Sequence, residues 1–272
     1  MSTLSRPFPD LRLPRSIVRA PLDAVDAVDA PIGRLHSIET GAAADGPGVR
    51  FVFFLAGCPF RCLYCHNPDT WKLSSGRPVT IEEALAEVRP YAGFLRRVGG
   101  VTLSGGEPLT QPAFARALLE AVHDDLGLHT ALDTQGFLGH KVDDGFFDAV
   151  DLVLLDVKHS DDARHRALTG RALAPTLDFA RRLVRLGKRM WIRHVLVPGW
   201  TDDPAHLDRL ADLLLDLGPA VERVDVLPYH RLGASKWTDL GRPYALAEVD
   251  PPSARAVSAA VDRLVARGLP AC

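Results

Sequence analysis

The sequence predicts an α/β fold, a partial parallel barrel of the (β/α)6 type with about six strand–helix units. Two observations lead to this prediction. Strand-like and helix-like segments alternate along the chain from Gly33 onward, which is the order expected when helices connect parallel strands. The predicted strands are also nearly continuous in Val, Leu and Ile, as parallel strands are when helices cover both faces of the sheet.

Six segments have the apolar run of a buried strand. They are residues 49–57, 101–108, 129–136, 151–159, 189–200 and 221–230. Polar residues gather at the C-terminal ends of most of them: Cys58–Cys65, Ser104–Glu107, Asp133–Thr134, Asp156–Lys158 and His230. Parallel barrels carry their chemistry at the C-terminal ends of their strands. We therefore expect these residues to form one site.

Five segments have apolar residues at helical spacing. They are residues 81–95, 114–127, 176–187, 205–218 and 254–268. Pro90 should break or kink the first of these helices, because proline lacks a backbone N–H. Glycines close several of the others, as they commonly do at helix ends.

Residues 1–31 are rich in Pro, Arg, Asp and Ala and include the run DAVDAVDA, so we predict a flexible extension followed by one domain over residues 32–272. The chain shows neither a secretory signal nor a run of apolar residues long enough to span a membrane, which predicts a cytoplasmic protein. Its 32 basic and 34 acidic residues are interspersed, and the net charge is −2. This balance favours neither a nucleic acid nor a membrane surface as partner.

Three of the four cysteines lie within eight residues, at Cys58, Cys62 and Cys65. In a reducing compartment such clustering indicates metal binding rather than disulfides. Three thiolates on one tight loop can bind three irons of a cubane [4Fe-4S] cluster and leave the fourth iron open to a small molecule. The fourth cysteine, Cys272, is the last residue, and we expect it to fray and take no part.

Three other interpretations of the loop stay open. The cysteines and His66 could bind zinc, although structural zinc sites usually fill all four positions. The stretch from Cys62 to His66 fits the C-x-x-C-H pattern of c-type haem attachment, which would require export and would leave Cys58 unused. The loop could also be a redox dithiol or a chance cluster.

The C-x3-C-x2-C loop and the later Ser-Gly-Gly-Glu strand end identify the sequence as similar to the radical S-adenosylmethionine enzymes. Within that group it resembles the pyruvate formate-lyase activating enzymes. Eight blocks carry this resemblance in order: GRLHSIET, DGPGVRFVFF, RCLYCHNPDTW, GGVTLSGGEP, LDTQGF, DLVLLDVK, WIRHVLVPGWTDD and LPYHRLGASKW. The resemblance covers residues 32–272 and implies a radical S-adenosylmethionine catalytic domain with that family's partial barrel.

The resemblance also implies roles for individual residues. Cys58, Cys62 and Cys65 would bind the [4Fe-4S] cluster. The residues implied to contact S-adenosylmethionine are Tyr64, Cys65, His66, Gly106, Asp156, Val157, Lys158 and His230. The implied ligands of a monovalent cation are Asp133, Thr134 and Asp156. Asp45, in the Asp-Gly-Pro-Gly turn, would meet the glycine-bearing loop of the protein substrate.

The activity that the resemblance implies is reductive cleavage of S-adenosylmethionine to a 5′-deoxyadenosyl radical, which takes a hydrogen atom from a glycine of pyruvate formate-lyase. An electron donor such as flavodoxin would be a second partner. The alternatives are activation of another glycyl radical enzyme, a radical enzyme for small molecules, or a non-catalytic iron–sulfur or zinc module. Residues 67–101 contain no cysteine, which favours the shorter pyruvate formate-lyase type over relatives with an inserted ferredoxin-like segment.

Overall fold

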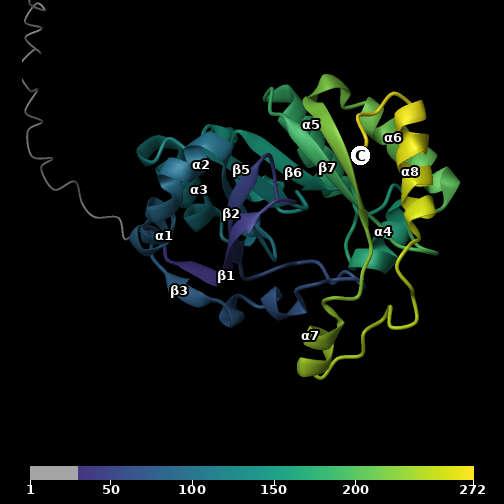
Figure 1. The fold of residues 1–272 in the computed structure, drawn as a ribbon, viewed down its shortest axis with the longest axis horizontal. Helices are drawn as coiled ribbons and strands as arrows, with labels where there is room; N and C mark the ends of the chain where they lie inside the picture. Colours follow the sequence, from purple (N-terminus) through teal and green to yellow (C-terminus); the bar gives the residue numbers. More distant parts are fainter. Residues whose placement is uncertain (1–29) are drawn as a thin grey trace, which may run out of the picture. The chain divides into compact units, whose positions relative to one another are not determined.

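An eight-stranded sheet organises the chain, with the strands in the order β3-β1-β2-β4-β5-β6-β7-β8 (Figure 1). The structure, a computed structural model, describes residues 30–272, so the extension predicted over residues 1–31 lies almost entirely outside the described residues. The strands are β1 (Gly33–Ala42), β2 (Val49–Leu55), β3 (Arg77–Val79), β4 (Gly99–Gly105), β5 (His129–Thr134), β6 (Leu152–Asp156), β7 (Met190–Leu196) and β8 (Val221–Pro228).

The six strands β2 and β4–β8 run parallel to one another, which confirms the predicted (β/α)6-type arrangement. Two further strands extend the sheet, because β1 runs antiparallel to both β2 and β3. The sheet stays open, with β3 and β8 as its edges in the described chain. The barrel is therefore partial.

Helices connect the parallel strands. They are α1 (Ile81–Val88), α2 (Ala92–Val98), α3 (Pro112–Glu120), α4 (Asp162–Thr169), α5 (Ala174–Arg185), α6 (Pro204–Leu215), α7 (Ala234–Asp239) and α8 (Ala254–Ala266). In Figure 1, α1–α3 lie at one end of the curved sheet, and α4–α6 and α8 lie at the other.

The predicted break at Pro90 is present, because α1 ends at Val88 and a 3-10 turn over Arg89–Tyr91 separates it from α2. Local caps explain where several helices begin. Thr80 forms a capping box with Glu83 at the start of α1, and Asp203 caps α6. Helices α4 and α7 were not among the predicted segments, because each is short and its apolar face is narrow.

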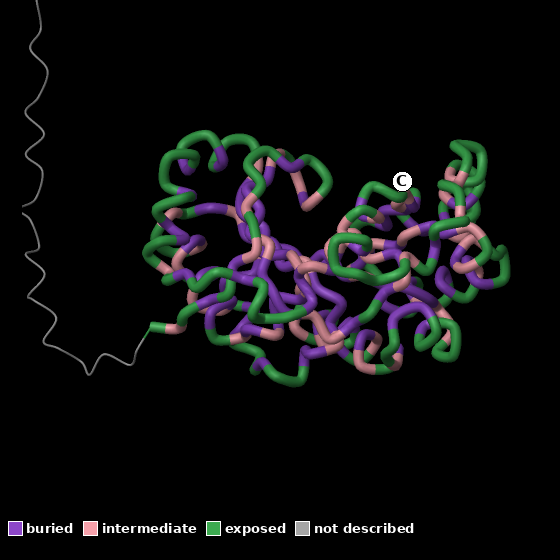
Figure 2. Tube along the Cα trace, turned by 90° about the horizontal axis from the view of Figure 1, so that it is seen from below, coloured by how far each residue is buried: buried purple, intermediate pink, exposed green. Residues whose placement is uncertain are grey.

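Along four of the six parallel strands, a buried aliphatic residue is followed directly by a polar residue of the site. The pairs are Leu103 and Ser104, Leu132 and Asp133, Leu155 and Asp156, and Ile192 and Arg193. Successive side chains of a strand point to opposite faces, so the aliphatic residues join the core beneath the helices while the polar ones face the barrel interior. Each buried aliphatic side chain stabilises the fold by about 1.5–3 kcal/mol, which makes the strands a rigid support for the polar residues. Figure 2 shows the buried segments running through the centre of the domain.

No helix among the residues that the structure describes is both long enough and apolar enough to cross a membrane.

Candidate functional site

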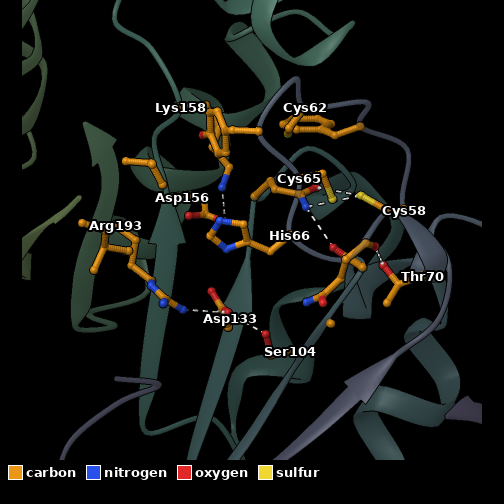
Figure 3. A pocket seen from close by; sticks show the side chains of 18 of the residues that line it. Cys58, Cys62, Cys65, His66, Thr70, Ser104, Asp133, Asp156, Lys158 and Arg193 are labelled. Atoms are coloured by element: carbon orange, nitrogen blue, oxygen red, sulfur yellow. Dashed lines mark hydrogen bonds and ion pairs between the residues drawn. The ribbon is translucent and has the colours of Figure 1, made fainter. Parts of the chain in front are cut away.

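A cavity of about 450 Å³ collects nearly every residue that the sequence singled out (Figure 3). The predicted residues that line it are Asp45, Cys58, Cys62, Tyr64, Cys65, His66, Gly106, Asp133, Thr134, Asp156, Lys158 and His230. Val157 alone among the predicted site residues does not line it. Its side chain lies in the hydrophobic core, its N–H donates to the carbonyl of Arg193, and its own carbonyl is bonded to His194.

The cysteine loop follows β2 and is held from both sides by main-chain hydrogen bonds. Gly57 turns the chain with a φ of +95° and donates to the carbonyl of Thr70. On the other side, the N–H groups of Arg61 and Leu63 donate to the carbonyls at the end of α4. These contacts bring the three cysteines, which form no disulfide, to one side of the cavity.

Burial keeps the three thiols protonated until a metal binds. It raises the pKa of Cys58 to about 12, and it raises the pKa of Cys62 and of Cys65 as well. Metal binding would displace these protons, as it does at other cysteine sites. Binding of a metal at these thiols would therefore be coupled to the release of their protons.

Within residues 30–272, no three Cys, His, Asp or Glu side chains come close enough together to surround a single metal ion. Zinc holds its sulfur ligands at about 2.3 Å, which requires such a compact group. In addition, His66 directs its Nε2 to the carbonyl of His230 at 3.0 Å rather than toward the thiols. The arrangement fits a multi-iron cluster, with one iron for each thiol, better than a single zinc ion.

A second part of the cavity is a buried ion-pair network. The guanidinium of Arg193 lies 2.9 Å from Oδ2 of Asp133 and 3.3 Å from Oδ1 of Asp45, and Ser104 donates to Asp133 at 2.6 Å. Burial raises the pKa of Asp133 to about 6, partly offset by Arg193. Burial also opposes the charge of Arg193, but the surrounding carboxylates outweigh it and raise the pKa of this guanidinium. Both groups are therefore charged at neutral pH.

Lys158 and Asp156 form the neighbouring pair, with Nζ and Oδ2 2.8 Å apart. Burial disfavours the charge of Lys158, but the attraction of Asp156 outweighs this effect and raises the pKa of Lys158 well above its usual range. The ammonium group also lies 5.5 Å from the ring centre of Tyr64. The cavity thus presents a fixed cation beside an aromatic face.

Buried polar atoms without a hydrogen-bond partner mark this cavity as a binding site for a polar molecule. Among the described residues five such side-chain atoms occur, and four of them belong to the cavity lining: Tyr64 Oη, Asp133 Oδ1, Arg193 Nε and His230 Nδ1. A buried polar atom without a partner costs about 1–3 kcal/mol. A polar ligand that satisfied these atoms would recover that free energy.

The Ser-Gly-Gly-Glu segment, residues 104–107, packs against the start of the cysteine loop at Gly57. A Cβ on Gly106 would meet the carbonyl oxygen of Gly57 at 2.4 Å, so only glycine allows this approach. The N–H of Gly106 donates to Leu55, and its carbonyl accepts from the side chain of Gln135. Glu107 accepts from Thr134 Oγ1 and from main-chain N–H groups, and burial raises the pKa of Glu107 to about 7.

Asp45 is positioned by a buried arginine. Arg50 donates to the hydroxyl of Thr102 at 3.0 Å and to the carbonyl of Val101, and Thr102 in turn donates to the carbonyl of Asp45 at 2.6 Å. Burial lowers the pKa of Arg50 to about 10, which leaves it charged at neutral pH. A Cβ on Gly48 would lie 1.8 Å from the carbonyl oxygen of Val98, so the turn packs tightly against the sheet.

Cys272 does not line the cavity. The expectation that it frays is wrong, because its N–H donates to Val224 and its carbonyl accepts from Val226, both in β8. Its thiol lies 3.3 Å from Oδ1 of Asp225.

Arg193 and Gln135 are two polar residues of the cavity that were not singled out from the sequence. Arg193 joins two of the predicted carboxylates, and Gln135 lies within 3.5 Å of the Cys58 sulfur. A signal for Arg193 was present, because a charged residue inside an otherwise apolar strand requires a partner. Nothing local distinguished Gln135, since its contacts come from two other strand ends.

Comparisons with known proteins agree with this geometry. The model of the Radical SAM superfamily matches residues 52–213, which is more than half of the chain. The pyruvate formate-lyase 1-activating enzyme of Escherichia coli (strain K12) is 45% identical over 224 residues, covering 81% of this chain and 90% of that protein. The pyruvate formate-lyase-activating enzyme of Staphylococcus aureus (strain USA300) is 44% identical over 236 residues, covering 84% and 93%.

A solved domain of the pyruvate-formate lyase-activating enzyme from Bacteroides vulgatus superimposes with a TM-score of 0.52 at 26% identity, covering 64% of this chain and 98% of that domain. The fold, the cavity and the sequence relatives lead to the same assignment. The chain belongs to the Radical SAM superfamily and, within it, to the family of the pyruvate formate-lyase activating enzymes.

Proposed function

We propose that residues 32–272 form a catalytic domain that activates pyruvate formate-lyase. One observation carries the proposal. Three free thiols and four buried polar atoms without hydrogen-bond partners lie in one cavity, together with the charged groups of Lys158 and Arg193. When bound, a [4Fe-4S] cluster and S-adenosylmethionine supply one-electron cleavage of the sulfonium C–S bond to a 5′-deoxyadenosyl radical.

The residues of the chain would bind and orient these groups. Cys58, Cys62 and Cys65, which line the cavity, would bind the cluster through their thiolates, and an iron without a protein ligand would be open to S-adenosylmethionine. The aromatic and basic side chains of the same cavity bind the nucleoside, with Tyr64 and Lys158 adjacent to each other. The other residues proposed to contact it are His66, Gly106, Asp156, Val157 and His230.

A monovalent cation would bind beside the carboxylate of S-adenosylmethionine. Its proposed ligands are Asp133, Thr134 and Asp156. Asp133 keeps one buried oxygen without a partner, which supports this role. The hydroxyl of Thr134 donates a hydrogen bond to Glu107, and Asp156 is paired with Lys158. These contacts would hold the two proposed ligands in place.

The substrate glycine would enter next to Asp45, which lies within reach of Arg193. A glycine suits hydrogen abstraction because its Cα radical is stabilised by the flanking amides and no side chain blocks access. The contribution of the protein is to hold the adenosyl C5′ against that Cα before the radical forms. The buried lining also excludes water and oxygen from the reacting atoms.

We further infer that the protein works in the cytoplasm with a protein electron donor such as flavodoxin. Three reduced thiols without disulfide partners require a reducing compartment. A cluster that cleaves S-adenosylmethionine must also be reduced by one electron before each turnover.

The test is anaerobic reconstitution with iron and sulfide, followed by assay of 5′-deoxyadenosine under reducing conditions. The reconstituted protein should then generate the electron paramagnetic resonance doublet of a glycyl radical on pyruvate formate-lyase, and not on a glycerol- or choline-cleaving relative. Zinc in place of iron, or a cluster with four protein ligands, would refute the proposal. A doublet only on the relative would replace the substrate and keep the chemistry.

A further inference from the structure

Three arginines from separate parts of the chain converge on the outer side of the cysteine loop. Arg61 lies in the loop itself, Arg171 lies between α4 and α5, and Arg242 follows α7. All three are exposed, and none of them lines the cavity, although Cys58, Cys62 and Trp71 do. The loop therefore has an inner side that faces the cavity and an outer side that carries these cations.

Two of the three guanidinium groups donate to carbonyls of the loop, and the third packs on Trp71. Arg61 donates to the carbonyls of Cys58 and Phe60 at 2.7 and 2.6 Å, and Arg171 donates to the carbonyl of Pro59 at 2.8 Å. Arg61 also lies over the Trp71 ring, 4.7 Å from its centre.

Arg242 is 5.3 Å from the centre of the same Trp71 ring. All three cations thus lie against residues 58–61 and Trp71, next to the cluster-binding thiols.

Their charges are not compensated. Within residues 30–272, none of the three is within ion-pair distance of a carboxylate, whereas many other arginines of the chain are paired. Asp69, which lies two residues before Trp71, pairs with His36 and Lys236 rather than with these arginines. Each guanidinium has five N–H donors, and the loop carbonyls occupy only some of them. The remaining donors suit carboxylates of a partner.

We propose that Arg61, Arg171 and Arg242 form the docking surface for the electron donor, a small redox protein whose flavin or iron–sulfur group is ringed by carboxylates. The inference rests on the proposed function. In that function the nucleotide and the substrate glycine occupy the inner side of the loop, so an electron must enter from the outer side. One electron passes from the reduced donor to the cluster, and no bond of this chain is made or broken. Weak redox complexes need only a small, electrostatically matched surface.

The test measures binding of an acidic flavodoxin to the reconstituted protein by calorimetry, at low and at high salt. Reversing two charges in the double variant Arg171→Glu/Arg242→Glu should weaken binding about tenfold or more at low salt. The difference should shrink at high salt, because the Debye length falls from about 30 Å at 0.01 M to about 8 Å at 0.15 M. The variants Arg171→Lys and Arg242→Lys keep the charge and should retain binding.

Arg97→Glu is the matched control. Arg97 is exposed in the last turn of α2, next to the first residue of β4, and so lies at the opposite end of the strands from the cysteine loop. The Arg97→Glu substitution changes the net charge by the same amount as the reversal of one arginine of the docking surface, and it should leave flavodoxin binding unchanged. If Arg97→Glu weakened binding as much as the reversals at residues 171 and 242, the effect would be one of net charge, and the proposed surface would be refuted.

A second readout separates this inference from the proposed function. Photoreduced deazaflavin is a small reductant that needs no docking surface, so it should support S-adenosylmethionine cleavage equally in the wild type and the double variant. Failure of the wild type with deazaflavin would refute the proposed function. Normal cleavage with deazaflavin, together with flavodoxin binding that is absent from the wild type or unchanged in the double variant, would refute the docking surface alone. Weakened binding of pyruvate formate-lyase with unchanged flavodoxin binding would reassign the surface to the substrate and also refute the inference.

Discussion

Lowering the pH from 7.5 to 5.0 should destabilise the chain through three buried histidines that lie behind the cavity. His194 is bonded through Nδ1 to the carbonyl of Val157 at 2.8 Å, which requires a proton on that nitrogen. Its Nε2 must then accept from Nε2 of His206, 3.3 Å away, and Nδ1 of His206 accepts from the hydroxyl of Ser160 at 2.7 Å. The ring of His159 stacks on His206 at 3.9 Å. This relay is complete only while the rings are neutral.

The pKa values determine the sign and size of the effect. Burial lowers the pKa of His206 to about 2 and that of His159 to about 4, from an ordinary value of 6.5. The unfolded chain therefore binds more protons than the folded chain below pH 6.5, and the penalty grows as the pH falls toward the folded pKa. At pH 5.0 each ring should cost about 1–2 kcal/mol relative to pH 7.5.

Two buried carboxyl groups act in the opposite direction. The pKa of Glu107 is raised to about 7 and that of Asp133 to about 6, so the folded chain binds their protons first and gains stability as the pH falls through those values. The pH profile of the wild type alone therefore combines opposing contributions. A comparison between variants isolates the histidines.

The assay is urea unfolding of the metal-free protein at pH 7.5 and 5.0, followed by circular dichroism. His206→Gln keeps an acceptor for Ser160 and a donor for His194 but cannot be protonated. Its loss of stability on acidification should be smaller than that of the wild type by about 1–2 kcal/mol. His140→Gln, which replaces an exposed histidine, is the matched control and should leave the acid sensitivity of the wild type unchanged. Equal acid sensitivity in the wild type and His206→Gln would refute the reasoning.

Three further predictions concern the cavity and its supports. Cys62→Ala should prevent cluster binding. Cys272→Ala should leave the iron content unchanged, because the thiol of Cys272 lies outside the cavity. Iron analysis that showed a full cluster in Cys62→Ala would contradict this assignment. Asp133→Asn should weaken S-adenosylmethionine binding about tenfold and leave the iron content unchanged, because the charged partner of Arg193 and a cation ligand are both lost. If equilibrium dialysis showed that S-adenosylmethionine binding by the wild type does not depend on potassium, the cation site would be refuted. Arg50→Met should reduce glycyl radical formation more than 5′-deoxyadenosine formation, because Arg50 holds the turn that contains Asp45. Arg50→Lys should be closer to the wild type. An equal loss of both products in Arg50→Met would indicate a general loss of structure instead.

The parallel sheet and the cysteine loop could both be predicted from local patterns. The continuous aliphatic runs and the alternation with helices depend on neighbouring residues only, and the six parallel strands follow from them. The spacing of Cys58, Cys62 and Cys65 likewise lies within one short loop. The antiparallel strands β1 and β3 were not among the predicted segments, and β3 is only three residues long and carries no periodic signal.

The alternation of a buried aliphatic residue with a polar one along four of the parallel strands indicated which residues would share the barrel interior. It did not indicate which of them would pair. Arg193 comes 60 residues after Asp133 and 148 after Asp45. The register of β5, β6 and β7 brings Arg193 to Asp133, and the turn between β1 and β2, bonded to Thr102 of β4, brings Asp45 to the same guanidinium. The relay of histidines arises in the same way, from β7, α6 and the loop after β6.

The sequence by itself determined the fold class, the spacing of the cysteine loop and many of the polar residues that line the cavity, because strand pleating and loop spacing are properties of short segments. The tertiary structure alone decided three things: the pairing of Arg193, the four unsatisfied polar atoms that mark the cavity, and the convergence of Arg61, Arg171 and Arg242 outside it. The physical reason is that ion pairs and hydrogen bonds require atoms within about 3–4 Å. Residues far apart in the chain reach such distances only after the sheet has set their relative positions.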